Sequence, residues 1–232
     1  MSDAILALHT SDAVGSVAVA QGGTFTGHEF ASAGRAAPVV LREMLAALSQ
    51  AGLELADCTA LAVTLGPGSF TGIRIGLATV QGLAAARRWP VLVTDSLSAF
   101  SAACAPGDWI RGVVFDARRG EVYAALYDGA APEPRCLLEP FCAPVAEAAA
   151  QLARAADGGS MMWAGSGAAL VQESAPRGTA AVDQPVMPVG VALARLAVAG
   201  ACRRAEPRGL EPIYLRMSDA ELHRQAAGEW RP

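Results

Sequence analysis

Charged residues are scarce in this chain. They make up 17% of its 232 residues, whereas hydrophobic residues make up 53%. A composition this apolar can bury a sizeable core, so disorder is not expected. The length allows either one large domain or two small ones.

A basic patch of the kind that grips nucleic acid is also missing from the sequence. The formal net charge is −4, and the densest basic spots are the single pairs Arg87-Arg88, Arg118-Arg119 and Arg203-Arg204. Proteins that bind nucleic acid on their own usually concentrate basic residues on one surface. We therefore interpret these pairs as solvated surface arginines, and we do not expect tight nucleic-acid binding by this chain alone.

Paired cysteines and long apolar runs are absent as well. The five cysteines are Cys58, Cys104, Cys136, Cys142 and Cys202. No two of them form a C-x-x-C pair, so neither a disulfide framework nor a zinc ribbon is expected. The chain starts with a strand-like run rather than a signal peptide, and no apolar run reaches the ~18 residues that span a bilayer. These features predict a cytoplasmic protein with reduced thiols and no membrane association.

The first half of the chain predicts three strands followed by alternating helices and strands. The three strands are expected over Ala4–Leu8, Gly15–Ala20 and Thr24–Phe30. A helix should begin at Pro38 and stop at Gly52. After it come a strand over Ala60–Leu65, a helix over Thr71–Arg88, a strand over Val91–Thr94 and a short helix capped by Asp95 or Ser96.

The second half repeats this order. Its expected elements are strands over Arg111–Phe115, Glu121–Tyr127 and Arg135–Phe141, a helix over Pro144–Ala156, and a strand over Met161–Ala164 that leads into the Gly165-Ser166-Gly167 turn. Such a repeat predicts a duplicated α/β fold with one sheet per domain. The expected domains are residues 1–104 and 105–232, with a final helix over Val189–Arg203 packing back on the first domain.

The stretch from Gly66 to Gly76 reads GPGSFTGIRIG and joins a predicted buried strand to the start of a helix. Free backbone N–H groups and the helix dipole suit such a place to an anion. It is not a P-loop, because no Gly-Lys-Ser/Thr follows at the required spacing. The alternative interpretation is a sharp strand-to-helix turn that only glycines can make. The local sequence leaves both interpretations open.

The helix after this turn carries small residues in two stripes. Gly72 and Gly76 form one stripe, and Ala78, Gly82 and Ala86 form the other. Glycine inside a helix costs roughly 0.5–1 kcal/mol relative to alanine. The close approach of another backbone would offset this loss through dense dispersion contacts. That backbone could belong to the same chain or to another subunit.

These motifs closely resemble the TsaB (YeaZ-type) family. The GPGSFTGIRIG run is highly specific, and the match continues through Leu77-Ala78-Thr79 to Gly82-Leu83-Ala84. Weaker matches occur in the family's order, at Thr10-Ser11, Pro38, Asp116–Tyr123 and Tyr214-Leu215-Arg216. The resemblance covers nearly the whole chain.

The resemblance implies a fold of the actin, Hsp70 and sugar-kinase type, which is a duplicated, ribonuclease H-like α/β fold. It also implies a catalytic paralogue, TsaD, and a small P-loop ATPase, TsaE. Together they would transfer a threonylcarbamoyl group onto the adenosine beside the anticodon of tRNA. A TsaB-like subunit docks on TsaD through helices of its N-terminal domain, without catalysing the transfer, and tRNA would meet it only indirectly. The same surface can form a homodimer.

Two departures from the family pattern are visible. His9 stands where many members have Asp, and Ser32 stands where members often have His. Because that Asp helps to hold metal and phosphate in catalytic relatives, any phosphate loop here would be vestigial. Its residues would be Thr10, Ser11, Gly66, Gly68 and Ser69.

The sequence favours a scaffold over an enzyme. The catalytic paralogue uses an H-x-x-x-H metal pair where this chain reads Ser96-Leu97-Ser98-Ala99-Phe100, and His9, His28 and His223 have no helical ligand spacing. We therefore expect no catalytic residue, metal or cofactor. Two alternatives stay open: a sugar- or acetate-kinase-like phosphotransferase, in which Asp12 would replace the missing acid, and a metal-dependent peptidase. Cys58 and Cys104 are interpreted as buried inert thiols.

The expected partner surface consists of the two helices after Pro38 and Thr71, in a four-helix contact with the equivalent helices of TsaD. Its predicted residues are Val39, Arg42, Glu43, Leu45, Ala46, Gly72, Ile73, Arg74, Gly76, Leu77, Val80 and Gln81. The periodicity does not determine which helix face points outward.

Overall fold

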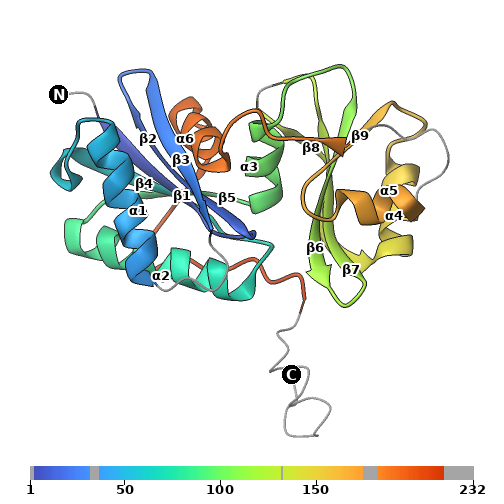
Figure 1. Cartoon of the computed structure of the whole chain (residues 1–232), viewed down its shortest axis with the longest axis horizontal. Coiled ribbons are helices and arrows are strands. Elements are labelled where there is room, and N and C mark those ends of the chain that lie inside the picture. Colours follow the sequence, from blue (N-terminus) through green and yellow to red (C-terminus); the bar gives the residue numbers. More distant parts are fainter. Residues whose placement is uncertain (1–2, 32–36, 132, 175–181, 217–232) are drawn as a thin grey trace, which may run out of the picture.

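The chain folds into two lobes, each built on one sheet (Figure 1). A computed structural model describes residues 3–31, 37–131, 133–174 and 182–216. Both sheets mix parallel and antiparallel strands and are flanked by helices. This arrangement confirms the predicted α/β class with two mixed sheets. Ser32 and His223, which the sequence analysis singled out, lie outside the described residues.

The N-terminal lobe is built on a six-stranded sheet with the order β11-β5-β4-β1-β2-β3. Its strands are β1 (Ala4–His9), β2 (Val14–Gln21), β3 (Thr24–Ala31), β4 (Cys58–Thr64), β5 (Val91–Thr94) and β11 (Arg203–Ala205). β1 pairs antiparallel with β2 and parallel with β4, so it lies in the middle of the sheet. Helices cover both of its faces, which explains why β1 and β4 are continuous apolar runs.

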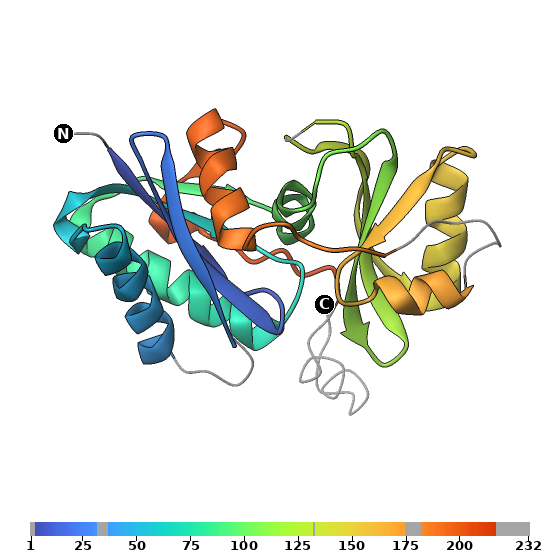
Figure 2. The same ribbon diagram turned by 45° about the horizontal axis from the view of Figure 1, so that its top comes forward.

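Helices α1 (Ala37–Gln50) and α2 (Phe70–Arg87) cover one face of this sheet, and α6 (Val189–Ala199) covers the other. Because successive side chains of a strand point to opposite faces of the sheet, a hydrophobic core forms on each face. Leu6 and Leu8 of β1 face Met44 of α1, whereas Ala7 faces Leu193 of α6. Figure 2 shows the sheet between α6 and the α1–α2 pair.

The C-terminal lobe is built on a five-stranded sheet with the order β10-β9-β6-β7-β8. Its elements are β6 (Ile110–Arg118), β7 (Glu121–Asp128), β8 (Arg135–Pro144), α4 (Val145–Ala155), β9 (Met161–Ala164), α5 (Ala168–Ser174) and β10 (Val182–Asp183). Helices α4 and α5 pack on one face of the sheet. Helix α3 (Ser96–Ala103) lies between the lobes, where Leu97 packs on Phe115 and Ala99 packs on α6 (Figure 1).

Local capping chemistry sets several helix ends. The Asp95 side chain accepts the Ser98 N–H at 2.8 Å and starts α3, as predicted. The prediction of a last helix reaching Arg203 is wrong, because α6 ends at Ala199. Gly200 follows with φ +78°, a left-handed conformation that ends helices. Short 3-10 turns, η1 (Leu55–Asp57) and η2 (Pro207–Gly209), complete the elements. No described helix is both long and apolar enough to cross a bilayer.

The chain returns to the N-terminal lobe after α6. Strand β11 pairs antiparallel with β5, so Ala205 lies opposite Val91 at the edge of the first sheet. The sequence pattern predicts that the last helix packs back on this lobe, but it does not predict the strand that follows the helix. The predicted domain limits, 1–104 and 105–232, stay a prediction.

A buried arginine fixes the segment that joins the lobes. Arg111 of β6 has a side chain that is only 2% exposed, and its guanidinium lies 3.3 Å from the Asp183 carboxylate. It also donates hydrogen bonds to the backbone carbonyls of Ser101, at 3.3 Å, and of Ala105. One side chain therefore ties together β6, β10 and the end of α3.

Replacing Arg111 with alanine should strongly destabilise the fold. Removing one partner leaves the other charge buried and unpaired, which costs about 3–5 kcal/mol. The measurement is urea denaturation of the wild type and Arg111→Ala. Arg135→Ala is the control, because Arg135 is 74% exposed and pairs with Asp128 at 3.2 Å, where about 0–1 kcal/mol is expected. Equal losses in both variants would contradict this role of Arg111.

Candidate functional site

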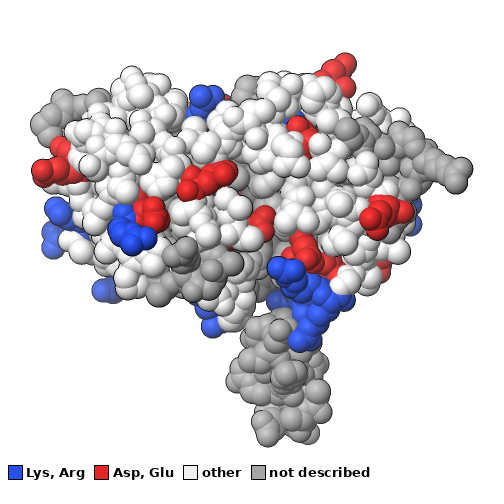
Figure 3. All heavy atoms as spheres, in the orientation of Figure 1, with Lys and Arg blue, Asp and Glu red and all other residues white. Residues whose placement is uncertain are grey.

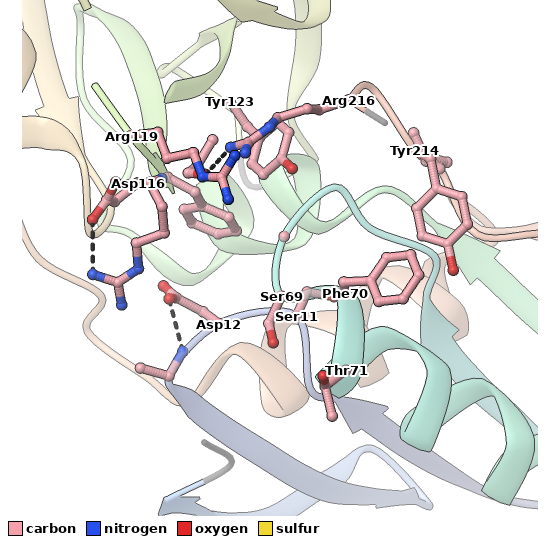
Figure 4. A pocket seen from close by; sticks show the side chains of 16 residues that line it. Ser11, Asp12, Ser69, Phe70, Thr71, Asp116, Arg119, Tyr123, Tyr214 and Arg216 are labelled. Carbon is pink, nitrogen blue, oxygen red and sulfur yellow. Dashed lines mark hydrogen bonds and ion pairs between the residues drawn. The ribbon is translucent and has the colours of Figure 1, made fainter. Parts of the chain in front are cut away.

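A cavity of about 460 Å³ lies at the junction of the two lobes (Figure 4). One wall is formed by residues 11–13 after β1 and residues 68–71 at the start of α2. The opposite wall is formed by residues 115–119, at the turn after β6, together with Tyr123. Ile213, Tyr214 and Arg216 line it as the chain returns between the lobes.

Three residues of the predicted phosphate loop, Ser11, Gly68 and Ser69, line the first wall, and its polar groups bond within the chain. The Ser69 N–H donates to the Ser11 carbonyl at 2.7 Å. The Ser69 hydroxyl caps α2 by accepting the Gly72 N–H at 3.2 Å. A Cβ on Gly68 would lie 2.0 Å from the Ser11 carbonyl oxygen, and Gly68 has φ +150°. These contacts favour the sharp-turn interpretation of Gly66–Ser69, and a phosphate-binding role for Thr10, Ser11, Gly66, Gly68 and Ser69 stays a prediction.

The second wall is electropositive. Arg118 and Arg119 both have left-handed backbones, with φ of 67° and 56°, at the β6–β7 turn. Arg118 forms an ion pair with Asp116 at 3.2 Å. Arg216 forms one with Glu121 at 3.2 Å and donates to the Ala117 carbonyl. Basic side chains gather below the junction of the lobes in Figure 3. Chemically, this wall can attract an anion towards the hydroxyl groups of the first wall.

An aromatic stack fastens the returning segment to the start of α2. The rings of Phe70 and Tyr214 have centroids 5.1 Å apart. The Arg74 guanidinium carbon lies 3.7 Å from the Phe70 ring centroid, and Arg74 Nε donates to the Tyr214 hydroxyl at 2.8 Å. Arg74, predicted as a partner contact, is therefore engaged within the chain. The sequence pattern could not link Phe70 to Tyr214, because only the tertiary fold brings them together.

His9, at the end of β1, is a buried structural histidine. Its side chain is fully buried, and its Nδ1 lies 3.0 Å from the Thr64 hydroxyl, which is in turn 3.2 Å from the Ser11 hydroxyl. Burial lowers the pKa of His9 to about 4, so the imidazole is neutral at pH 7. The position at which the family resemblance implies an acid in catalytic relatives thus holds a neutral ring.

Acidification should destabilise the fold through His9. Because the pKa is lowered in the folded state, the unfolded chain binds the proton more readily between about pH 4 and 6.5. The stability that depends on a neutral His9 is therefore present above pH 6.5 and is lost as the pH falls towards 4. Between pH 7 and pH 5 the loss should be about 2 kcal/mol.

The measurement compares urea denaturation of the wild type and His9→Gln at pH 7 and pH 5. Glutamine keeps hydrogen-bonding capacity but has no proton to gain in this range. The wild type should lose about 2 kcal/mol more than the variant on acidification. Parallel losses in the two proteins would show that His9 is not responsible.

The stretch Ser96–Phe100, where the family resemblance implies a metal pair in the catalytic paralogue, has hydrophobic and hydroxyl side chains here. Ser96 is fully buried at the start of α3, and Phe100 packs edge-on against Phe115 with centroids 5.3 Å apart. Across the described ranges, no group of three His, Cys, Asp or Glu residues is placed to hold a metal ion. Burial raises the pKa of Cys58 to about 11 and that of Cys104 to about 12, so both remain thiols at neutral pH.

The Gly72–Gly76 stripe faces the chain's own β1–β2 turn. A Cβ on Gly72 would lie 2.0 Å from the Thr10 carbonyl oxygen, and one on Gly76 would lie 2.3 Å from the Thr10 hydroxyl oxygen. The Thr10 hydroxyl donates to the Gly72 carbonyl at 2.8 Å. The interpretation of this stripe as a contact with another subunit is therefore wrong, because the approaching backbone is intramolecular.

Two alanine substitutions in α2 should have opposite effects. Gly76→Ala forces a Cβ against Thr10 and should destabilise the fold by about 1–3 kcal/mol, as overpacking does. Gly82→Ala meets nothing within 4 Å and should stabilise α2 by about 0.5–1 kcal/mol. Thermal unfolding of both variants provides the measurement. Stabilisation by Gly76→Ala would contradict the close packing at Thr10.

The predicted partner residues divide between the core and the surface. Ile73, Leu77 and Val80 are at most 4% exposed and belong to the core of the N-terminal lobe. Gly72 and Gly76 point inward as well. The prediction that these five residues form the partner surface is therefore corrected: α2 is rotated about its axis so that all five face the chain's own core. Of the remaining predicted residues, Arg42, Leu45 and Arg74 are exposed, and Val39, Glu43, Ala46 and Gln81 are partly exposed.

The outward face of α2 consists of small residues that the predicted partner set omitted. Ala78, Gly82, Ala85 and Ala86 are exposed along it. On α1, which packs beside α2, Leu45 is 44% exposed. We call this surface the α1–α2 face, defined by Arg42, Leu45, Ala78, Gly82 and Ala85. The sequence shows these small residues as the second stripe of the helix, but it does not show that this stripe faces outward.

The chain matches the family model of TsaD, tRNA N6-adenosine threonylcarbamoyltransferase, over residues 35–164, which is more than half of its length. The TsaB tRNA threonylcarbamoyladenosine biosynthesis protein of Escherichia coli is 36% identical over 129 residues, covering 53% of this chain and 54% of that protein. The TsaB protein of Bacillus subtilis is 39% identical over 71 residues, covering 31% of each. The matched regions thus span about half and about a third of these curated relatives.

Solved structures extend the likeness to almost the whole chain. A Pseudomonas aeruginosa protein described as similar to peptidase YeaZ is 30% identical, with a TM-score of 0.79 over 92% of this chain and 100% of that chain. YeaZ from Pseudomonas aeruginosa is 28% identical, with a TM-score of 0.76 over the same shares. The duplicated two-lobe fold is therefore shared along the full length of these structures.

Proposed function

The chain belongs to the TsaB (YeaZ) family of tRNA threonylcarbamoyladenosine biosynthesis proteins, and from this membership we propose that it is a non-catalytic scaffold subunit. It binds and activates a TsaD-like catalytic paralogue in the cytoplasm, together with a TsaE-like ATPase. That complex modifies the adenosine beside the anticodon of tRNA. The observation that carries the proposal is the α1–α2 face, which is exposed and, apart from Arg42, built from small and apolar residues.

The composition of the α1–α2 face suits close helix packing. Between Arg74 and Arg87, α2 has no charged residue, and its exposed positions are alanine and glycine. Small side chains allow a second helix to approach closely, and exposed Leu45 on α1 supplies an apolar anchor. Interface cores are depleted of charge in the same way. The equivalent two helices of a TsaD-like paralogue would complete a four-helix contact, and a second copy of this chain would use the same face in a homodimer.

Three features of the cleft support a role without catalysis. Neutral His9 occupies the end of β1, where catalytic relatives hold an acid. Phe100 packs into the core at the paralogue's second metal-ligand position. The N–H of Ser69 and the hydroxyl of the same residue bond within the chain. In each case, a group that would bind metal or phosphate is either replaced by another side chain or already hydrogen-bonded within the chain.

One observation favours the phosphotransferase alternative. The electropositive wall of Arg118, Arg119 and Arg216 faces a cavity of about 460 Å³, which suits an anion. Titration of the chain with ATP and magnesium by calorimetry tests this alternative, and the scaffold proposal expects no heat of binding. The peptidase alternative would instead be favoured by stoichiometric bound metal in the purified protein.

A bulky charge on the α1–α2 face should prevent assembly. Gly82→Arg introduces a long cationic side chain into open space on α2, where the partner helix is proposed to lie. We expect its affinity for the TsaD-like protein of the same organism to fall at least tenfold, because burying an unpaired charge is strongly unfavourable. Light scattering after size-exclusion chromatography measures the complex.

Gly82→Ala is the matched control and should bind as the wild type does, since alanine is already common on this face. The thermal midpoints of both variants establish that the fold is intact. If Gly82→Arg forms the complex as tightly as Gly82→Ala, the α1–α2 face is not the docking surface.

A further inference from the structure

The fold brings two separate basic pairs to one edge of the N-terminal lobe. β11 is the edge strand of the first sheet and pairs with β5, so Arg204 lies opposite Leu92. Arg87 and Arg88 close α2 immediately before β5. The turn η2, which carries Arg208, packs against α2. We call this surface the arginine edge, defined by Arg87, Arg88, Arg203, Arg204 and Arg208.

The arginine edge holds uncompensated charge. All five side chains belong to exposed residues. Within the described ranges none of them pairs with a carboxylate, whereas Arg42, Arg111, Arg118, Arg135 and Arg216 all do. The acidic residues nearby are Glu206 on the same segment and Asp57, whose charge acts with that of Arg87 on Cys58. The edge thus stays positive in a chain whose formal net charge is −4.

The geometry of the edge suits an extended polyanion. Alternation along β11 directs Arg203 and Arg204 to opposite faces of the strand, so the arginines wrap around the edge. Arg204 is level with Leu92 of β5, and Arg88 at the end of α2 precedes Leu92 by four residues. Blue side chains stand at the lower left margin of Figure 3, over the end of α2. A nucleic-acid backbone presents several phosphates along such an edge.

We propose that the arginine edge is a contact surface for the phosphate backbone of tRNA in the assembled modification complex. This rests on the proposed function, because that function brings tRNA to the subunit. Arginine forks match phosphate oxygens in bidentate hydrogen bonds, and unpaired guanidinium groups lose no internal ion pair on binding. The edge is continuous with the α1–α2 face, since α2 carries Gly82 on that face and ends at Arg87. A tRNA held by a partner on the α1–α2 face would therefore reach it.

The test uses two double variants with the same loss of charge. Arg204→Gln with Arg208→Gln removes two arginines of the edge. Arg154→Gln with Arg195→Gln removes two exposed arginines elsewhere, on α4 and α6. Filter binding measures the affinity for tRNA of each variant, alone at about 50 mM salt and in complex with the TsaD-like protein and the TsaE-like ATPase over a range of salt concentrations. Light scattering gives the mass of each complex, and thermal midpoints establish that the variants fold.

In the complex, the edge variant should bind tRNA at least tenfold more weakly than the wild type. The plot of log affinity against log salt concentration should become less steep by about 1.4–1.8, as expected for two lost phosphate contacts. The control should stay within twofold of the wild type. Equal tRNA binding by the two variants overturns the proposal. So does an edge variant that keeps tRNA but loses the ATPase partner, which would make the edge a protein-docking surface. If the wild type forms no complex, the proposed function fails, while the chain-alone measurement still decides whether the edge binds tRNA.

Discussion

The contact between Thr10 and the glycine face of α2 determines how the rest of the N-terminal lobe is arranged. Thr10 follows the central strand β1, and its carbonyl and hydroxyl groups occupy the space where Gly72 and Gly76 lack a Cβ. This contact fixes the rotation of α2 about its axis. It therefore decides that Ile73, Leu77 and Val80 enter the core and that Ala78, Gly82 and Ala85 point outward.

Three surfaces of the molecule follow from that rotation. At its N-terminal end α2 closes the cleft, where Phe70 and Arg74 hold the returning segment at Tyr214. Along its length it presents the α1–α2 face, and at its C-terminal end it carries the first pair of the arginine edge. One rigid helix thus connects the interlobe cleft, the proposed docking face and the proposed tRNA contact. A scaffold needs such a fixed spatial relation between partners, whereas it does not need a reactive group.

Local sequence signals predicted the elements well but could not orient them. The apolar run of β1, the Asp95 cap of α3 and the GPGSFTGIRIG turn each carry their own structural cause, so their elements were found with small errors at the ends. The two small stripes of α2 are chemically alike, and only tertiary contact with Thr10 distinguishes them. Strand β11 has three residues and is defined by pairing with β5, which no local pattern can report. For the same reason the pairs Arg87-Arg88 and Arg203-Arg204 looked isolated in the sequence.

Amide hydrogen exchange of the chain with and without its TsaD-like partner tests the central claim most directly. We predict slower exchange over α1 (Ala37–Gln50) and α2 (Phe70–Arg87) on binding, and unchanged exchange over α6 (Val189–Ala199), which covers the opposite face of the sheet. Slower exchange confined to α6 or to the C-terminal lobe would contradict the account, because the partner would then dock on a surface that the rotation of α2 does not create.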